Sequence, residues 1–379
     1  MLSNELHNIK WIDNDTQFSE MLEDILEQSI IGVDTESDSL YVYHEKVCLI
    51  QLSTSNTDYL VDPLKINNLH PLNDVFFNEK IEKIFHAAEY DIMCLKRDFN
   101  FQFSNIFDTM IASRILSKNK FGLSNLLNEY FDLEINKKYQ RANWGRRPLS
   151  EEMINYASVD SHYLIALRNI LHRDLISKNL FDLAQEDFNR ICNVESFQAH
   201  KTNDVCWKMV KGNHLSHIQM TVLMELCNFR ENLAKNKNIP AFKVIGPEVL
   251  IEIAKNCPKS IQNLSEIKGV SAKLINKYGN DLIKCVQIGL VNQPVSRQHK
   301  IKPSEAYMLR YESLKNWRKN KANNLGVESD VILPKDLIDI ISTKNPNSTD
   351  ELIIIMREVP YRFNRYGNEI LELLSNLGG

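Results

Sequence analysis

The sequence predicts an α/β domain with a mixed sheet, followed by two all-α helical domains. Two observations lead to this prediction. Short strand-like apolar runs alternate with amphipathic helical segments near the N-terminus, whereas helical periodicity dominates from Phe107 to Leu180 and again after residue 213. The second observation is an internal repeat, because three short motifs of the C-terminal half recur at one constant offset.

Residues 1–200 are expected to form the α/β domain. A short strand is predicted at Ile9–Ile12, and Asp15-Thr16 is expected to cap a helix at Phe18–Leu26. Three apolar runs with short hydrophilic links then predict an antiparallel meander, at Ile30–Thr35, Val47–Ser53 and Asp58–Val61. The pattern continues as a helix, a strand and a helix, at Leu69–Phe77, Ile81–His86 and Tyr90–Phe99. This alternation is typical of a mixed sheet with helices on its faces.

The pattern weakens over Asn193–Asn213, where we predict a linker. The two helical domains are expected at residues 211–291 and 302–379. They are copies of one unit, since three motif pairs keep an offset of 88 residues: Phe229-Arg230 with Trp317-Arg318, Ala254–Pro258 with Ser342–Pro346, and Lys277–Asp281 with Arg365–Glu369.

Composition restricts the possible classes of protein. The chain has 379 residues and a net charge of -4, but residues 1–200 carry 19 Lys/Arg against 31 Asp/Glu, whereas residues 211–290 carry 11 against 6. A basic domain behind an acidic one suits a polyanionic substrate, although charge alone favours ordinary surface variation. Seven scattered cysteines without a C-x-x-C pair indicate reduced thiols. With neither a secretory signal nor an apolar run long enough to span a membrane, we expect a cytoplasmic protein.

Several acidic side chains lie at positions where α/β domains commonly bind ligands. Asp34 and Glu36 lie two residues apart in a strand and therefore point to one face. Asp91 follows the strand Ile81–His86 in the first turn of a helix, and Tyr156 and Asp160 share one helix face. Each signal alone has an ordinary structural explanation, whereas their co-occurrence is specific. His86 is more typical of a structural strand end than of a metal ligand.

These residues resemble the DEDD exonuclease family, in the subclass with tyrosine in its third motif. Asp34 and Glu36 match the first motif, Asp91 the second, and Tyr156 with Asp160 the third. Further agreement lies in Glu45–Leu52, Phe107–Thr109, Gly122-Leu123 and Trp144–Leu149. The 88-residue repeat resembles the HRDC domain, and an exonuclease followed by two HRDC copies is similar to the ribonuclease D family.

The resemblance implies a ribonuclease H-like fold and 3′-5′ hydrolysis that releases nucleoside 5′-monophosphates. It also implies two divalent metal ions, with Asp34 bridging both, Glu36 and Asp160 completing one site, and Asp91 holding the other. All-oxygen ligation suits Mg²⁺ or Mn²⁺. Tyr156 would orient the attacking water. Ser37 departs from the family pattern, so Leu40 or Tyr41 becomes the candidate for a wedge against the terminal base.

A basic and aromatic cluster is the candidate substrate path. It comprises Lys137, Lys138, Arg141, Trp144 and Arg147, to which His86 is added as a possible substrate contact. Basic residues interleaved with aromatic ones suit a single strand, although an exposed basic loop explains them equally well.

We therefore predict a 3′-5′ exoribonuclease that trims single-stranded RNA 3′ ends, such as those of tRNA precursors. Two alternatives stay open: the same chemistry on DNA, and a non-catalytic nucleic-acid-binding protein. No membrane association is expected, and the sequence identifies no protein partner.

Overall fold

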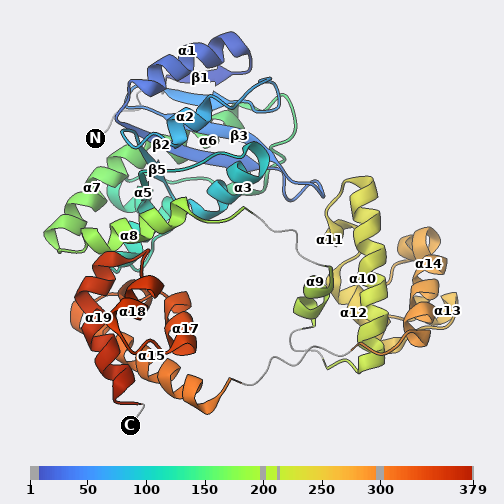
Figure 1. Cartoon of the computed structure of the whole chain (residues 1–379). Helices are drawn as coiled ribbons and strands as arrows, with labels where there is room; N and C mark the ends of the chain where they lie inside the picture. The colour runs from blue at the N-terminus through green and yellow to red at the C-terminus, as the bar shows by residue number, and fades with distance from the viewer. Residues whose placement is uncertain (1–7, 197–201, 211–213, 296–302, 378–379) are drawn as a thin grey trace. The chain divides into compact units, whose positions relative to one another are not determined.

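The computed structural model describes residues 8–196, 202–210, 214–295 and 303–377. The chain divides into two compact units, and Figure 1 shows their elements. The first unit comprises residues 1–37, 47–197 and 302–379, and the second comprises residues 38–46 and 198–301. The α/β domain thus shares a unit with the second helical domain. Over the described residues, no helix is both long and apolar enough to cross a membrane.

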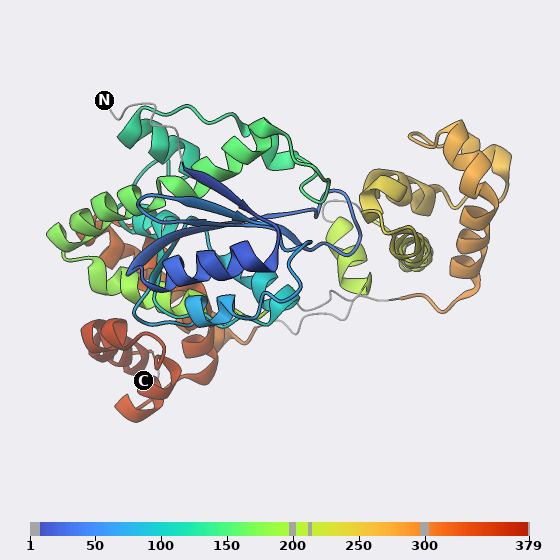
Figure 2. The ribbon, with the colours of Figure 1, turned by 90° about the horizontal axis from the view of Figure 1, so that it is seen from above.

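The centre of the first unit is a six-stranded mixed sheet, seen close to edge-on in Figure 2. The strands are β1 (Ile9–Ile12), β2 (Ile30–Ser37), β3 (Val47–Ser53), β4 (Asp58–Val61), β5 (Glu82–Phe85) and β6 (Ile106–Asp108), in the spatial order β1-β4-β3-β2-β5-β6. The β2–β3 and β3–β4 pairs are antiparallel, whereas β1–β4, β2–β5 and β5–β6 are parallel. The predicted mixed sheet and its meander are confirmed.

Helices cover the sheet on both faces and enclose separate apolar cores. They are α1 (Asp15–Leu26), α2 (Leu72–Phe76), α3 (Glu89–Phe99), α4 (Thr109–Ile115), α5 (Leu123–Phe131), α6 (Glu151–His162), α7 (Leu164–Ser177) and α8 (Phe181–Cys192). One core joins α1, α2 and α3 to the side chains of Ile31 and Val33 on β2. The other joins α4, α5, α7 and α8, and a smaller cluster packs α6 against β3. Central strand β2 is thereby held from both sides.

Three local predictions were wrong. Phe107 does not begin a helix but lies in β6, which has only three residues, all buried, and so gives no alternation to detect. The side chain of Asn14, rather than Asp15-Thr16, caps α1 by accepting from the Gln17 amide. The predicted linker contains the helix α9 (Thr202–Met209), while residues 197–201 and 211–213 of that linker lie outside the described part of the chain.

The two helical domains repeat element by element. The first consists of α10 (His217–Lys237), α11 (Ala241–Val244), α12 (Pro247–Asn256), α13 (Ile261–Ser265) and α14 (Ala272–Val291). The second consists of α15 (Glu305–Leu325), α16 (Ser329–Ile332), α17 (Lys335–Lys344), α18 (Thr349–Ile355) and α19 (Pro360–Ser375). Even the caps agree at the offset of 88 residues, since Cys257 and Asn345 both end their helices with positive φ, at 44° and 48°.

The second helical domain packs onto α8 through a buried arginine. The Arg362 side chain is fully buried, and its guanidinium lies 2.9 Å from both the Glu186 and the Asp187 carboxylates. It also donates to the Val331 carbonyl, at 2.9 and 3.1 Å. Glu186 accepts in addition from the backbone amide of Tyr361. This satisfied charge cluster is one of several contacts that pack the second copy on the α/β domain, which also include the Arg114–Asp330 ion pair.

Candidate active site

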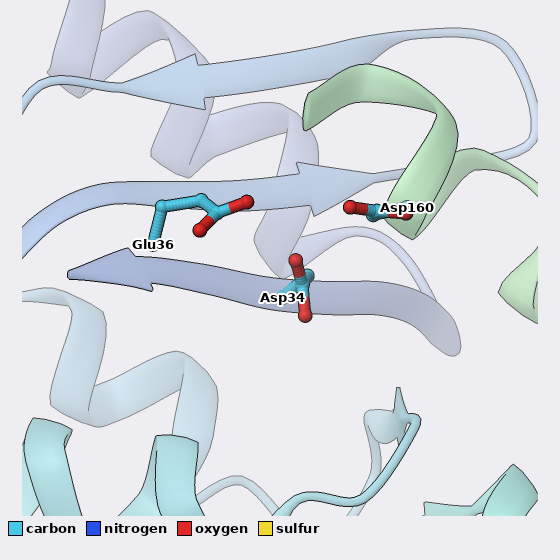
Figure 3. Close-up of side chains that lie close together, drawn as sticks. All are labelled: Asp34, Glu36 and Asp160. Atoms are coloured by element: carbon cyan, nitrogen blue, oxygen red, sulfur yellow. The ribbon is translucent and has the colours of Figure 1, made fainter. Parts of the chain in front are cut away.

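Three carboxylates converge at the middle of the sheet. Asp34 and Glu36 come from one face of β2, and Asp160 comes from α6, as Figure 3 shows. One carboxylate oxygen of each residue lies within 4.8 Å of those of the other two. Strand alternation explains the first two positions, because residues two apart on a strand share a face.

A glycine on the same strand lets α6 come close enough to deliver Asp160. Gly32 precedes Asp34 by two residues, and a Cβ atom there would lie 2.4 Å from the Ser161 carbonyl oxygen. The Ser161 hydroxyl also shares a hydrogen bond of 2.7 Å with Ser53, which is the β3 partner of Gly32 in the sheet register. Any side chain at Gly32 would therefore push away the helix that carries Asp160.

Asp91 is held beside this group by its own contacts. It lies in the first turn of α3, and Thr35, between the two β2 acids, donates a 2.5 Å hydrogen bond to its Oδ1 atom. The turn into α3 contains Ala87 at a φ of 63°, a left-handed conformation that an alanine rarely adopts. Buried Asp108 stabilises this turn by accepting from the amides of Ala87 and Ala88, at 3.2 and 2.7 Å.

Two of these supporting residues, Thr35 and Asp108, are not among the candidates that the sequence predicts. Thr35 lies between two motif acids and matches no motif position itself. Asp108 lies in the Phe107–Thr109 stretch, which predicts family membership but no role for this residue. A carboxylate next to the threonine that begins a helix is a visible N-cap signal, and Asp108 does cap α4 through the amides of Met110 and Ile111.

Burial and mutual repulsion make the four carboxylates reluctant to ionise together. Burial raises the pKa of Asp34 well above its usual value, and the charges of Asp91, Asp160 and Glu36 raise it further. Burial also raises the pKa of Glu36, again with the help of neighbouring acids. For both Asp91 and Asp160, burial raises the pKa to about 7. Among the described residues, no positive side chain is one of the main causes that act on these four pKa values.

The donor set fits a hard divalent cation. The group consists of carboxylates, the ligands that Mg²⁺ and Mn²⁺ prefer. Next to Asp34, Gln51 is fully buried, and within the described residues its Oε1 atom has no hydrogen-bond partner. An orphaned buried oxygen and a surplus of buried negative charge are both relieved by a cation.

Tyr156 belongs to the same site. Its phenol is buried and hydrogen-bonds to Asp160 one helical turn away. Burial is the main cause that raises the pKa of Tyr156 far above its usual value, and the charges of Asp160 and Glu36 add to it. The hydroxyl therefore stays protonated at neutral pH and acts as a hydrogen-bond donor.

His86 has a structural environment. Its Nδ1 atom lies 2.9 Å from the Thr109 hydroxyl, which itself donates to the Phe85 carbonyl. Burial lowers the pKa of His86 to about 4, so the ring is neutral. These contacts favour the structural explanation over a metal ligand or a charged contact to substrate.

The basic cluster divides into an exposed part and a buried part. Lys137, Lys138 and Arg141 are exposed on the short 3₁₀-helix Lys137–Arg141, and Tyr139 of this helix lies 5.8 Å from the Tyr156 ring. Trp144, in contrast, is 1% exposed and packs 6.2 Å from the Tyr156 ring.

Arg147 is likewise engaged inside the domain, because its guanidinium forms a bidentate pair with buried Asp62, at 2.6 and 2.7 Å. It also donates to the carbonyls of Cys48 and Trp144. The predicted substrate contacts of Trp144 and Arg147 are disfavoured by this burial and pairing. The contacts favour a supporting role instead, with Trp144 beside Tyr156 and Arg147 in the neighbouring loop.

The two wedge candidates lie in the segment 38–46, which belongs to the second unit. Leu40 is 39% exposed. The Lys243 ammonium lies 4.2 Å from the centre of the Tyr41 ring, a cation–π contact. Leu40 therefore has the freer side chain of the two.

Removal of metal should leave a pH-dependent instability. In EDTA, the buried acids of the folded protein keep protons that the unfolded chain has lost, so stability should fall as pH rises from about 4 to about 7. We expect the Asp160→Asn protein to have a higher melting temperature than the wild type at pH 8 in EDTA, with the difference vanishing near pH 4. Scanning calorimetry measures this, and a wild type that is the more stable protein at pH 8 would refute the electrostatic account. Mn²⁺ should reverse the order at pH 8.

Comparison with known proteins agrees with this geometry. Residues 9–176 match the 3′-5′ exonuclease family model, and residues 219–286 and 309–374 match the HRDC domain model. The chain is 31% identical over 283 residues to ribonuclease D of Desulfotalea psychrophila, covering 74% of this chain and 75% of that protein. It is 42% identical over 170 residues to the yeast exosome complex exonuclease RRP6, of which it spans only 23% of the length.

Solved structures give the same result for the fold. The catalytic core of RRP6 from Trypanosoma brucei is 28% identical with a TM-score of 0.69, covering 76% of this chain and 81% of that one. Escherichia coli RNase D has a TM-score of 0.68 at 21% identity, covering 95% of this chain and 99% of that chain. The second likeness concerns the fold alone.

Fold, site and family models together define a 3′-5′ exonuclease domain followed by two HRDC domains. The extent and identity of the match to ribonuclease D then place the chain plainly: it belongs to the ribonuclease D family.

Proposed function

We propose that this chain is a metal-dependent 3′-5′ exoribonuclease that removes nucleoside 5′-monophosphates from single-stranded RNA 3′ ends. The observation that supports the proposal is the convergence of the Asp34, Glu36 and Asp160 oxygens within 4.8 Å. The Tyr156 phenol is hydrogen-bonded to Asp160 of this cluster. We propose that the exonuclease domain spans residues 1–200, the first HRDC domain residues 211–291 and the second HRDC domain residues 302–379.

Each residue of the site has a proposed role. Asp34 would contact both ions, Glu36 and Asp160 would complete the site nearer the attacking water, and Asp91 would complete the other. Two divalent ions bound there would supply charge stabilisation at the attacking and leaving oxygens. The protonated Tyr156 hydroxyl would orient the water, and Thr35 fixes the Asp91 carboxylate by donating to it.

The proposed substrate is RNA rather than DNA, and precursors of tRNA are the proposed physiological class. Two relatives support this proposal, one being called ribonuclease D and the other a component of the exosome. The RNase D of Escherichia coli is described as an exoribonuclease involved in structured RNA processing. Exposed Lys137, Lys138 and Arg141 lie on the helix that packs beside Tyr156, where they can meet phosphates. We propose action in the cytoplasm.

The test compares matched RNA and DNA strands of one sequence, mixed in competition and labelled with different dyes. The proposal predicts faster loss of the RNA with Mg²⁺ or Mn²⁺. Faster loss of the DNA would favour the first alternative, a DNA exonuclease. Binding of both strands without cleavage would favour the second, a non-catalytic binding protein.

Replacement of Tyr156 tests its role in the chemistry. Tyr156→Phe removes only the hydroxyl that orients water, so the single-turnover rate should fall on the order of 10²-fold while RNA affinity stays unchanged. Tyr139→Phe is the matched control, because this second tyrosine packs 5.8 Å from the Tyr156 ring. Equal rates for Tyr156→Phe and the control would assign Tyr156 to packing.

A further inference from the structure

One surface of the first HRDC domain is not explained by its packing. Helix α14 turns one face toward α10 and α13, and its buried residues are Gly279, Leu282, Ile283, Val286 and Gly289. The two glycines permit this close contact, since a Cβ at Gly289 would lie 2.5 Å from the Val222 Cα atom. The opposite face of α14 is therefore directed to solvent.

That outer face carries a straight row of lysines. Lys273, Lys277 and Lys284 are all exposed, and at 100° per residue they fall within a sector of about 40° on the side away from the buried residues. The row is about 16 Å long, at 1.5 Å per residue. Within the described residues none of the three forms an ion pair with an acid. We call these three residues the α14 lysine row.

Neighbouring groups strengthen its positive potential. Lys237 of α10 lies 2.6 Å from the Tyr278 hydroxyl, and the Lys277 ammonium lies 5.1 Å from the centre of the same ring. Burial acts to raise the pKa of Tyr278, but the hydrogen bonds and charges of the two lysines outweigh it and lower this pKa. The Tyr278 ring can therefore stack on a base of a nucleic acid while the adjacent lysines contact its phosphates.

The second HRDC copy provides an internal comparison. At the offset of 88 residues, the α14 lysine row corresponds to Tyr361, Arg365 and Glu372 of α19, so the row is absent there. The first turn of α19 is instead used for docking, because Arg362, the equivalent of Leu274, is buried against α8. Helix α14 of the first copy thus has an exposed basic face, whereas α19 of the second copy has no net charge and packs against α8.

We propose that the two copies have different tasks: the first binds the RNA backbone through the α14 lysine row, and the second serves as a docking domain that does not bind RNA. This inference rests on the proposed function, since it names the partner as RNA. It predicts that, of the two HRDC copies, only the first contributes phosphate contacts, which depend on salt.

The experiment uses the full chain and a fluorescent oligouridylate in EDTA, which allows binding without cleavage. The variant Lys273→Glu/Lys277→Glu/Lys284→Glu removes the row. The matched control, Lys319→Glu/Lys344→Glu/Arg357→Glu, makes the same change in net charge at exposed residues of the second copy. The plot of log affinity against log salt should become shallower by roughly 2 for the first variant, at about 0.7 for each lost phosphate contact, and stay unchanged for the control.

Three results decide the matter. Loss of affinity confined to the first variant, with recovery in a triple Lys→Arg protein in which positive charge is kept, supports the inference. Equal losses in both variants would show general charge steering and overturn it, as would no loss in either. Cleavage of a trinucleotide with Mn²⁺ should be unaffected in every variant. If the wild-type protein itself does not cleave the trinucleotide, the proposed function is contradicted rather than this inference.

Discussion

Asp34→Asn should abolish most of the exonuclease activity while the fold survives. The substitution removes a charge from the centre of the carboxylate cluster, where one oxygen from each of three residues lies within 4.8 Å of the others. Loss of one transition-state contact costs on the order of 10²–10³ in rate, and weaker ion binding should add to this. The rate of RNA shortening at saturating Mn²⁺ measures the effect.

Two controls make this result specific. Asp24→Asn changes a carboxylate of α1 that accepts from the Tyr59 hydroxyl, and should cleave RNA at the wild-type rate. In EDTA at pH 8 the Asp34→Asn protein should melt no lower than the wild type, because burial and the neighbouring acids raise the pKa of Asp34. Wild-type turnover by Asp34→Asn would show that the cluster is not the catalytic centre.

Arg362→Met should produce the largest loss of stability. The substitution keeps a long side chain but leaves Glu186 and Asp187, both largely buried, without their shared cation. Breaking a buried ion pair by removing one partner typically costs about 3–5 kcal/mol. Calorimetry should show a melting temperature lower on the order of 10 °C.

The pH dependence separates this charge effect from simple loss of packing. Burial already acts to raise the pKa of Glu186 and Asp187, and Arg362 opposes it. Without the arginine both pKa values rise further, so the deficit should grow as pH increases above about 4. Glu186→Gln/Asp187→Asn combined with Arg362→Met should recover part of the stability at neutral pH. A deficit that is the same at pH 4 and pH 7 would contradict the charge explanation.

Much of the site could be predicted because its residues obey local rules. Strand alternation placed Asp34 and Glu36 on one face, and helix periodicity placed Tyr156 and Asp160 on another. Their convergence depends on close packing that no local pattern encodes. Gly32 is essential to this convergence, because it leaves room for the Ser161 carbonyl. A glycine within a strand does not by itself predict which residue packs against it.

Tertiary packing explains where the structure departs from the interpretation of the sequence. Trp144 and Arg147 have the composition of a nucleic-acid contact, but tertiary packing buries the first and pairs the second with Asp62. The docking of the second HRDC copy could not be predicted either. In the sequence Arg362 is indistinguishable from an exposed arginine, and only the fold brings it to Glu186 and Asp187 of α8. Strand β6 escaped detection since three residues are too few to show a period.

The central claim is stepwise, metal-dependent removal of nucleotides from the 3′ end, and a time course on RNA labelled at its 5′ end tests it most directly. With Mn²⁺ the account predicts a ladder that shortens one nucleotide at a time from full length, with nucleoside 5′-monophosphates as products. EDTA should stop the reaction. Internal cleavage from the first time point, or shortening that continues in EDTA, would contradict the account.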